Sequence, residues 1–171
     1  MKHSTLCVAL LFIATSKISG QETKNLEVDY NGFLNITKEL AEYRQARLID
    51  IETFNECSQE KNTIILDTRS KKAYDEIHLK GAIHLNFSDF TKAALKRVIG
   101  DKNTRILIYC NNNFESPLGA LMSKSTPLAL NIPTFINLYG YDYKNMYELD
   151  EYLDQDDPRV QFEGTKVDNQ H

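Results

Sequence analysis

The sequence Arg105-Ile-Leu-Ile-Tyr-Cys110-Asn-Asn-Asn-Phe-Glu-Ser116-Pro117 carries the clearest structural signal in this chain. Ile106 to Tyr109 is a short, continuous apolar run of β-forming residues, which is typical of a strand buried on both faces. Ser116 followed by Pro117 fits the N-cap and first residue of a helix. Cys110 is therefore predicted at the carboxyl end of a buried strand, where main-chain N–H groups and a helix dipole can stabilise a thiolate.

Residues 1–20 have the pattern of a signal peptide. Lys2 precedes an apolar run from Leu6 to Thr15, and small residues follow up to Gly20. The run is far shorter than the roughly 20 residues that span a membrane, so we expect no stable membrane span. Cleavage after Gly20 is expected, which would make the mature protein secreted or periplasmic.

The rest of the chain is predicted to be one domain. Of 171 residues, 42% are hydrophobic and 26% are charged, as in an ordinary globular domain. Loss of residues 1–20 removes two lysines and no acidic residue, which changes the net charge from −4 to −6. Because this acidic chain has no basic stripe, no binding of nucleic acid is expected.

Short apolar runs alternate with helical patterns along the chain. The expected strands are 48–49, 64–66, 83–85, 106–109 and 134–138, and the expected helices include 51–59, 88–99, 117–125 and a closing helix that carries Met146, Leu149 and Leu153. This alternation predicts an α/β fold with a mainly parallel β-sheet of about five strands and helices on both faces. The domain is expected at 36–163, after a polar lead-in at 21–35 and before a disordered tail at 164–171.

Loops that follow parallel strands meet at one edge of a sheet. We therefore expect Asp67–Arg69, Cys110–Glu115 and Tyr139–Tyr141 on the same rim, where open α/β sheets bind ligands. Cys110 also has a purely structural explanation, because free cysteines are often buried for packing. Cys57 lies on the apolar face of a predicted helix and is expected to pack there. A disulfide between Cys57 and Cys110 is the less favoured alternative.

Several motifs together resemble the rhodanese-like domain family. They are Asp67-x-Arg69 after a strand, His78-x-x-Gly81-Ala82-Ile83 before the next strand, a strand that ends on Cys110, and Asn137-Leu-Tyr-Gly140 before the final helix. The resemblance covers roughly residues 36 to 155. In that family the cysteine accepts a sulfane sulfur from a donor such as thiosulfate, becomes a persulfide and passes the sulfur to a thiophilic acceptor.

The resemblance implies a role for each matching residue. Cys110 would be the nucleophile that carries the sulfur, and no cofactor or metal would be required. The supporting residues that brace the fold would be Asp67, Arg69 and His78. The main-chain amides of the following loop would hold the anionic sulfur, namely those of Asn111, Asn112, Asn113, Phe114, Glu115 and Ser116. The partners would be a small sulfur donor or acceptor, or the thiol of a partner protein.

Two loop residues differ from those common in active members of the family. Asn113 stands where glycine is frequent, and asparagine tolerates the left-handed backbone that glycine would adopt. Glu115 stands where a basic or hydroxyl residue is common. A carboxylate beside the sulfur raises the thiol pKa and repels an anionic donor. Either Glu115 points to solvent, or the substrate is not thiosulfate.

Other site chemistries fit less well. A related cysteine-loop phosphatase would need an arginine at the position of Ser116. His78, His84, Cys57 and Cys110 have no zinc-like spacing, so no metal site is expected. Two hypotheses therefore stay open: an exported sulfurtransferase or persulfide carrier that uses Cys110, and a non-catalytic rhodanese-fold binding module in which Cys110 is structural or vestigial.

Overall fold

The structure is a computed structural model that describes residues 27–115 and 121–168. The chain from Asn31 onward forms one compact unit, and residues 27–30 are described before it. The expected signal peptide and its cleavage after Gly20 lie outside the described residues. Ser116 and Pro117 lie outside them too.

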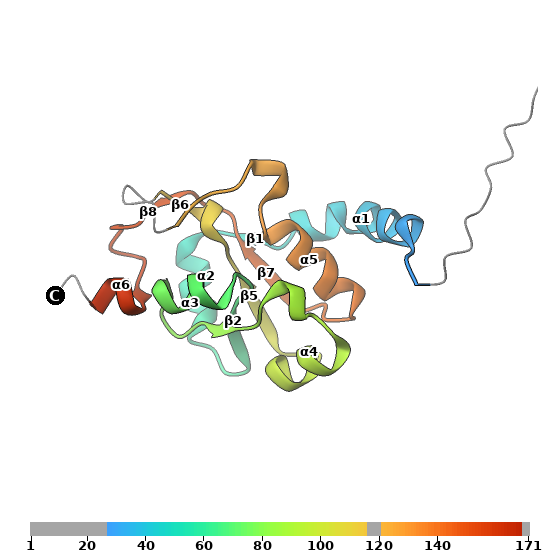
Figure 1. The fold of residues 1–171 in the computed structure, drawn as a ribbon, viewed down its shortest axis with the longest axis horizontal. Coiled ribbons are helices and arrows are strands. Elements are labelled where there is room, and N and C mark those ends of the chain that lie inside the picture. The colour runs from blue at the N-terminus through green and yellow to red at the C-terminus, as the bar shows by residue number, and fades with distance from the viewer. Residues whose placement is uncertain (1–26, 116–120, 169–171) are drawn as a thin grey trace, which may run out of the picture. The chain divides into compact units, whose positions relative to one another are not determined.

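The centre of the fold is a five-stranded parallel sheet in the order β1-β7-β5-β2-β4 (Figure 1). Its strands are β1 (Leu48–Ile49), β7 (Met146–Leu149), β5 (Arg105–Ile108), β2 (Thr63–Asp67) and β4 (Ile83–His84). Every neighbouring pair is parallel. The predicted α/β fold with a sheet of about five strands is therefore confirmed.

Helices cover both faces of this sheet (Figure 1). They are α1 (Tyr30–Gln45), α2 (Ile51–Ser58), α3 (Lys71–Glu76), α4 (Lys92–Ile99), α5 (Asn131–Gly140) and α6 (Thr165–Asp168). Side chains of α1, α4 and α5 share one core with Ile106 and Ile108 of β5, whereas α2 packs in a second core with Leu107 and Tyr109. Alternate residues of β5 thus point into opposite cores, which explains its continuous apolar sequence.

Short elements complete the fold at the edges of the sheet. β3 (His78–Leu79) pairs antiparallel with β9 (Phe162–Glu163), and β6 (Phe114–Glu115) pairs parallel with β8 (Leu153–Asp154). Three 3₁₀ turns are η1 (Phe87–Asp89), η2 (Asn111–Asn113) and η3 (Thr126–Leu128). The carboxyl end differs from the expected disordered tail at 164–171, because α6 occupies Thr165–Asp168.

Two element predictions near the end of the chain are wrong. Residues 134–138, expected as a strand, lie in α5, and Met146–Leu149, expected in a helix, forms β7 between β5 and β1. A short apolar run does not distinguish a strand from a buried helix, which explains the first error. The second arises because Met146, Leu149 and Leu153 recur at helical spacing, although they lie in two separate strands, β7 and β8.

The rim prediction holds for two of its three loops. Arg69 donates from Nη1 to Asn111 Oδ1 at 2.8 Å, so the loops after β2 and β5 meet. Tyr141, by contrast, ends α5, and its carbonyl accepts from Lys102, which lies just before β5 begins. The Tyr139–Tyr141 segment is therefore at the opposite edge of the sheet, and that part of the prediction is wrong.

The helix expected at 117–125 is absent from its described part, because residues 121–125 are not helical. The chain after Cys110 makes the η2 turn and then enters β6. β6 pairs with β8, and η3 and α5 come later in the chain.

Candidate functional site

Cys110 lies two residues after the end of β5 and is 1% exposed. It is a free thiol, as is Cys57, so the alternative of a disulfide between them is wrong. A cavity of about 40 Å³ lies at Cys110, which is room for about one water molecule. It is lined by Arg69, Cys110, Asn111, Asn112, Met122, Lys124 and Leu130. The sulfur is thus closed off from solvent, but most of its surroundings are polar.

Three main-chain N–H groups lower the pKa of the Cys110 thiol, against the larger opposing effect of burial. They belong to Asn112, Leu130 and Asn131. Two of them come from the start of α5, whose N-cap residue Leu130 makes no side-chain capping bond. Helix N-termini carry unsatisfied donors and a partial positive charge. The helix end that faces the sulfur is therefore that of α5, and not the helix expected after Ser116.

The predicted loop cradle is wrong for Asn113 and Phe114, whose N–H groups bond to main-chain oxygens, and its last member, Ser116, lies outside the described residues. The N–H of Asn113 donates to Cys110 O at 3.1 Å, and the N–H of Phe114 donates to Asn111 O. Phe114 is buried in the core, and Glu115 pairs with β8. Of the predicted amides, that of Asn112 faces the sulfur.

Asn113 also differs from its prediction. The non-glycine residues with a positive φ in the described chain are Asn62 and Asp142, so Asn113 does not adopt the left-handed backbone. Its side chain is buried and bonds to three other parts of the fold. The contribution of Asn113 is thus made by its carboxamide and not by its backbone freedom.

Asp67 and Arg69 brace the loops around the site. Arg69 donates from Nη2 to Asp67 Oδ2 at 2.5 Å and to Ile77 O at 2.6 Å. Tyr109, the residue before Cys110, donates its hydroxyl to the same Asp67 oxygen at 2.5 Å. Both Asp67 and Arg69 are buried. This network connects β2, the end of β5 and the segment before β3.

His78 lies away from the Cys110 cavity. Its Nδ1 is 2.7 Å from Tyr74 O, and its ring stacks on Tyr74 with centroids 3.9 Å apart. His84 interacts through Nε2 with Arg69 O at 2.9 Å. These contacts give the two histidines a role in holding turns and loops.

Burial raises the pKa of the Cys110 thiol, and the carboxylate of Glu148 raises it further. Glu148 is 4% exposed on β7 and binds Arg44 through two hydrogen bonds of 2.7 and 2.5 Å. Glu115, the acid singled out from the sequence, is exposed and does not line the cavity. Sequence reasoning missed Glu148 because it assigned this residue to a helix.

Residues 121–125 lie over the thiol, and we call them the cover segment. Asn111 donates from Nδ2 to Met122 O at 3.0 Å. Asn112 donates from Nδ2 to Lys124 O at 2.7 Å and accepts at Oδ1 from Lys124 N at 3.0 Å. The side chains of Asn111 and Asn112 thus hold the cover segment by its main chain.

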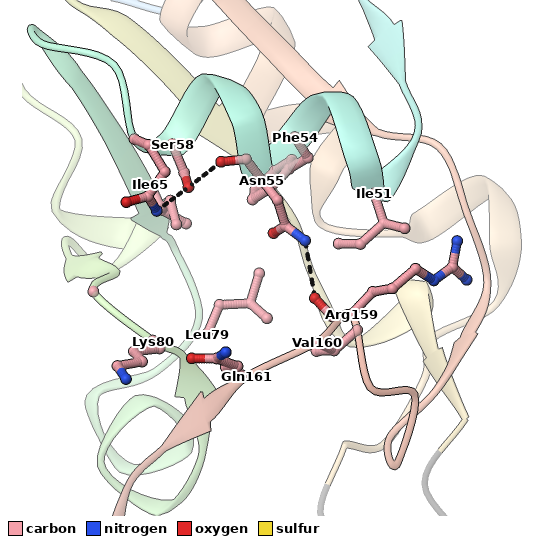
Figure 2. Close-up of a pocket in the computed structure, with 12 residues that line it drawn as sticks. Ile51, Phe54, Asn55, Ser58, Ile65, Leu79, Lys80, Arg159, Val160 and Gln161 are labelled. Carbon is pink, nitrogen blue, oxygen red and sulfur yellow. Dashed lines mark hydrogen bonds between the residues drawn. The ribbon is translucent and has the colours of Figure 1, made fainter.

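A larger cavity of about 560 Å³ lies between α2 and residues 159–161. Figure 2 shows Leu79 pointing into it, while the charged end of Arg159 points away. Its volume suits a small ligand. The described residues that line it include no cysteine, so the thiol chemistry expected from the sequence has no place there. The Cys110 cavity is therefore the candidate reactive site.

Two further searches cover the described ranges 27–115 and 121–168. No three His, Cys, Asp or Glu side chains within these ranges cluster in a way that could bind a metal ion. None of the helices there has the length and apolar character needed to cross a membrane.

Comparison with known proteins identifies the family. Residues 50–154 match the Rhodanese-like domain. Among solved structures, the BH2092 protein from Bacillus halodurans has 17% identity and a TM-score of 0.50, over 80% of this chain and 86% of that one, and it shows the shared fold. The Alr3790 protein from Anabaena sp. has 15% identity and a TM-score of 0.46, over 71% and 86%. No curated protein matches. The match over residues 50–154 shows that this chain belongs to the rhodanese-like domain family.

Proposed function

We propose that this protein is an exported sulfurtransferase or persulfide carrier that holds sulfane sulfur on Cys110. The observation that carries the proposal is the position of the sulfur: Cys110 shares a cavity with Leu130 at the uncapped start of α5, and the main-chain N–H groups of Asn112, Leu130 and Asn131 favour its ionised form. A neutral thiol is a weak acceptor, whereas a thiolate or persulfide anion would satisfy these donors. Such an arrangement favours sulfur in its anionic form once it is present.

The proposed reaction has two balanced steps. The Cys110 thiolate attacks the sulfane sulfur of the donor, and a new S–S bond forms as the bond between that sulfur and the rest of the donor breaks. The rest of the donor leaves with the electron pair, as sulfite when thiosulfate is the donor. An acceptor thiolate then attacks the outer sulfur of the persulfide, and Cys110 leaves as a thiolate.

The charges at the cavity are compatible with an anionic donor. Arg69 and Lys124 both line it, whereas Glu115 does not. The reason to doubt thiosulfate from the sequence was a carboxylate beside the sulfur. Glu115 is exposed and outside the cavity, and the Glu148 carboxylate, which does act on the thiol, is paired with the Arg44 cation, so thiosulfate is included among the proposed donors.

The sulfur must become accessible before it reacts. At 1% exposure, Cys110 cannot be reached by a donor while the cover segment stays in place. We therefore place the chemistry in a state in which residues 121–125 have moved away. The bonds that hold this segment are at exposed or part-buried positions, where water can replace them.

The test is a mass measurement after incubation with sulfane donors. The protein is treated with thiosulfate and, separately, with polysulfide, and peptide mapping then locates any added sulfur. Cys110→Ser should lose the added sulfur, whereas the matched variant Cys57→Ser should keep it. Absence of added sulfur on Cys110 with every donor overturns the proposal.

Export forms part of the same proposal. A mature chain that begins at Gln21 would support cleavage after Gly20, and it can be identified by the intact mass of protein recovered from the producing organism. A chain that retains residues 1–20 would overturn it.

Complete burial of Cys110 favours a second candidate, the non-catalytic binding module. In that case Cys110 only packs, and the raised thiol pKa has no chemical purpose. The Cys110→Ser variant would then keep the biological role of the protein, whereas the sulfur-carrier proposal expects that role to be lost in a folded variant.

A further inference from the structure

The side chain of Asn113 uses its whole hydrogen-bonding capacity inside the fold. Its Oδ1 accepts from Cys110 N at 2.9 Å and from Asn131 Nδ2 at 3.1 Å. Its Nδ2 donates to Leu149 O at 2.8 Å and to Glu151 O at 3.1 Å. A carboxamide has two donor hydrogens and two acceptor lone pairs, so all four are used. The residue is only 6% exposed, which makes each bond costly to lose.

These four bonds join three elements that meet at the sulfur. Cys110 follows β5, Leu149 ends β7, and Asn131 is the first residue of α5. The parallel sheet already places β5 beside β7. The start of α5 has no side-chain cap of its own, so the bond from Asn131 to Asn113 is what ties it to the end of β5.

We propose that Asn113 is the positioning residue of this site: its carboxamide holds the first main-chain N–H groups of α5 opposite the Cys110 sulfur. This inference rests on the proposed sulfur chemistry, and it assigns the anion-holding donors to a helix that begins some twenty residues after the cysteine. A glycine at position 113 could shape a loop but could not bridge β7 and α5. Aspartate would lack the two donors, and alanine would lack all four bonds.

Three charged groups near Cys110 must stay constant in any test. Glu148 on β7 raises the pKa of the thiol, and Arg69 and Lys124 line the same cavity. None of the four bonds of Asn113 involves these side chains. Substitutions at Asn113 therefore change the amide donors and leave the nearby charges in place.

The experiment follows alkylation of Cys110 by iodoacetamide as a function of pH, with peptide mapping so that Cys57 and Cys7 do not contribute. In Asn113→Ala, the N–H groups of Leu130 and Asn131 are no longer held at the sulfur. We expect the apparent thiol pKa to rise by about one unit, which is about ten-fold less thiolate near neutral pH. An unchanged pKa in the folded variant overturns the proposal.

Two further variants separate positioning from general stability. Thr104→Val removes a buried hydroxyl that bonds Asn62 Oδ1 and Ile99 O just before β5 begins. It should lower the melting temperature and leave the Cys110 pKa unchanged. A pKa shift of equal size in this control would show a merely structural effect and overturn the proposal.

Asn131→Ala covers the case in which Asn113→Ala does not fold. Asn131 Oδ1 is buried with no hydrogen-bond partner within the described chain, so removing this side chain loses one bond and relieves one unsatisfied acceptor. We expect a small change in melting temperature and a rise in the Cys110 pKa. No rise would contradict the role given to the link between Asn113 and α5.

The pKa measurement tests the positioning role of Asn113 whether or not the protein transfers sulfur. If the pKa shifts as expected but the wild type never gains sulfur, the positioning role stands and the sulfur-carrier proposal fails. If the wild type and Asn113→Ala gain sulfur at equal rates, the positioning role alone fails.

Discussion

The carboxamide of Asn112 pairs with the main chain of Lys124 as one strand pairs with another. Nδ2 donates to Lys124 O at 2.7 Å, and Lys124 N donates to Oδ1 at 3.0 Å. This pair holds the cover segment over a thiol that is otherwise surrounded by polar groups. Both bonds are exposed to water, so their loss costs only about 1 kcal/mol each. The closed state of the site thus depends on contacts whose loss costs little free energy.

The first prediction concerns this cover. Asn112→Ala removes both side-chain bonds to Lys124 and keeps the main-chain N–H that faces the sulfur. We expect Cys110 to react with iodoacetamide about ten-fold faster, because the open state becomes more populated. The control is Asn145→Ala, which removes a bond to Asn103 O at the other edge of the sheet. Equal rates in all three proteins would show that the cover segment does not limit access.

The second prediction separates two acidic residues. Glu148→Gln should lower the pKa of Cys110, because the Glu148 carboxylate opposes ionisation of the thiol. Glu115→Gln should leave that pKa unchanged, since Glu115 is exposed and outside the cavity. The measurement is the pH dependence of Cys110 alkylation. A larger effect of Glu115→Gln would contradict the arrangement described here.

The third prediction concerns the buried Arg69–Asp67 pair. Arg69→Ala leaves the Asp67 carboxylate buried without its cation and should lower the free energy of unfolding by about 3–5 kcal/mol. Arg159→Ala is the matched control, because Arg159 forms ion pairs at the surface with 40% of its side chain exposed. Its loss should cost about 1 kcal/mol or less. Urea unfolding measures both values, and similar costs would contradict the bracing role of Arg69.

The fourth prediction concerns alkaline pH. Burial and the Asp67 carboxylate raise the pKa of Tyr109 well above its usual value, and burial raises that of Cys110. In the unfolded chain these groups lose their protons at lower pH than in the folded protein. The stability they contribute is therefore complete below their unfolded pKa values, about 8.5 for cysteine and about 10 for tyrosine, and is lost as the pH rises from there through the higher folded-state values.

Tyr109→Phe tests this assignment. The variant should be less stable than the wild type at neutral pH, because Leu79 N and Asp67 lose a partner. It should also lose less stability between neutral and alkaline pH, since one titrating group is gone. Urea unfolding at both pH values gives the comparison. The same alkaline loss in both proteins would exclude Tyr109 as the cause.

The centre of the fold could be predicted from the sequence, whereas its last third could not. Ile106 to Tyr109 is apolar throughout because β5 is buried on both faces, and this local pattern also predicts that Cys110 follows at the strand end. Glu148 interrupts the same kind of pattern in β7. Its burial requires Arg44 from α1, a partner 104 positions away that no local pattern reveals.

In the candidate site, too, contacts between residues close in sequence could be predicted, whereas contacts between distant residues could not. Asp67 and Arg69 are two residues apart, so their pairing could be expected from the motif. Asn113 and Asn131 are separated by a long loop, and their contact depends on where α5 begins relative to β5. Sequence reasoning therefore took the amide donors from the loop after Cys110, whereas two of those that lower the thiol pKa belong to Leu130 and Asn131 at the start of α5.

The amino-acid sequence by itself determined a parallel α/β sheet with a thiol at the end of its central strand, because apolar runs and strand ends are local properties. Only the tertiary structure decided that this thiol is covered by residues 121–125, opposed by Glu148 and faced by the first N–H groups of α5. Those relationships join residues far apart in the chain, and they exist only once the sheet has brought the ends of β5 and β7 and the start of α5 together.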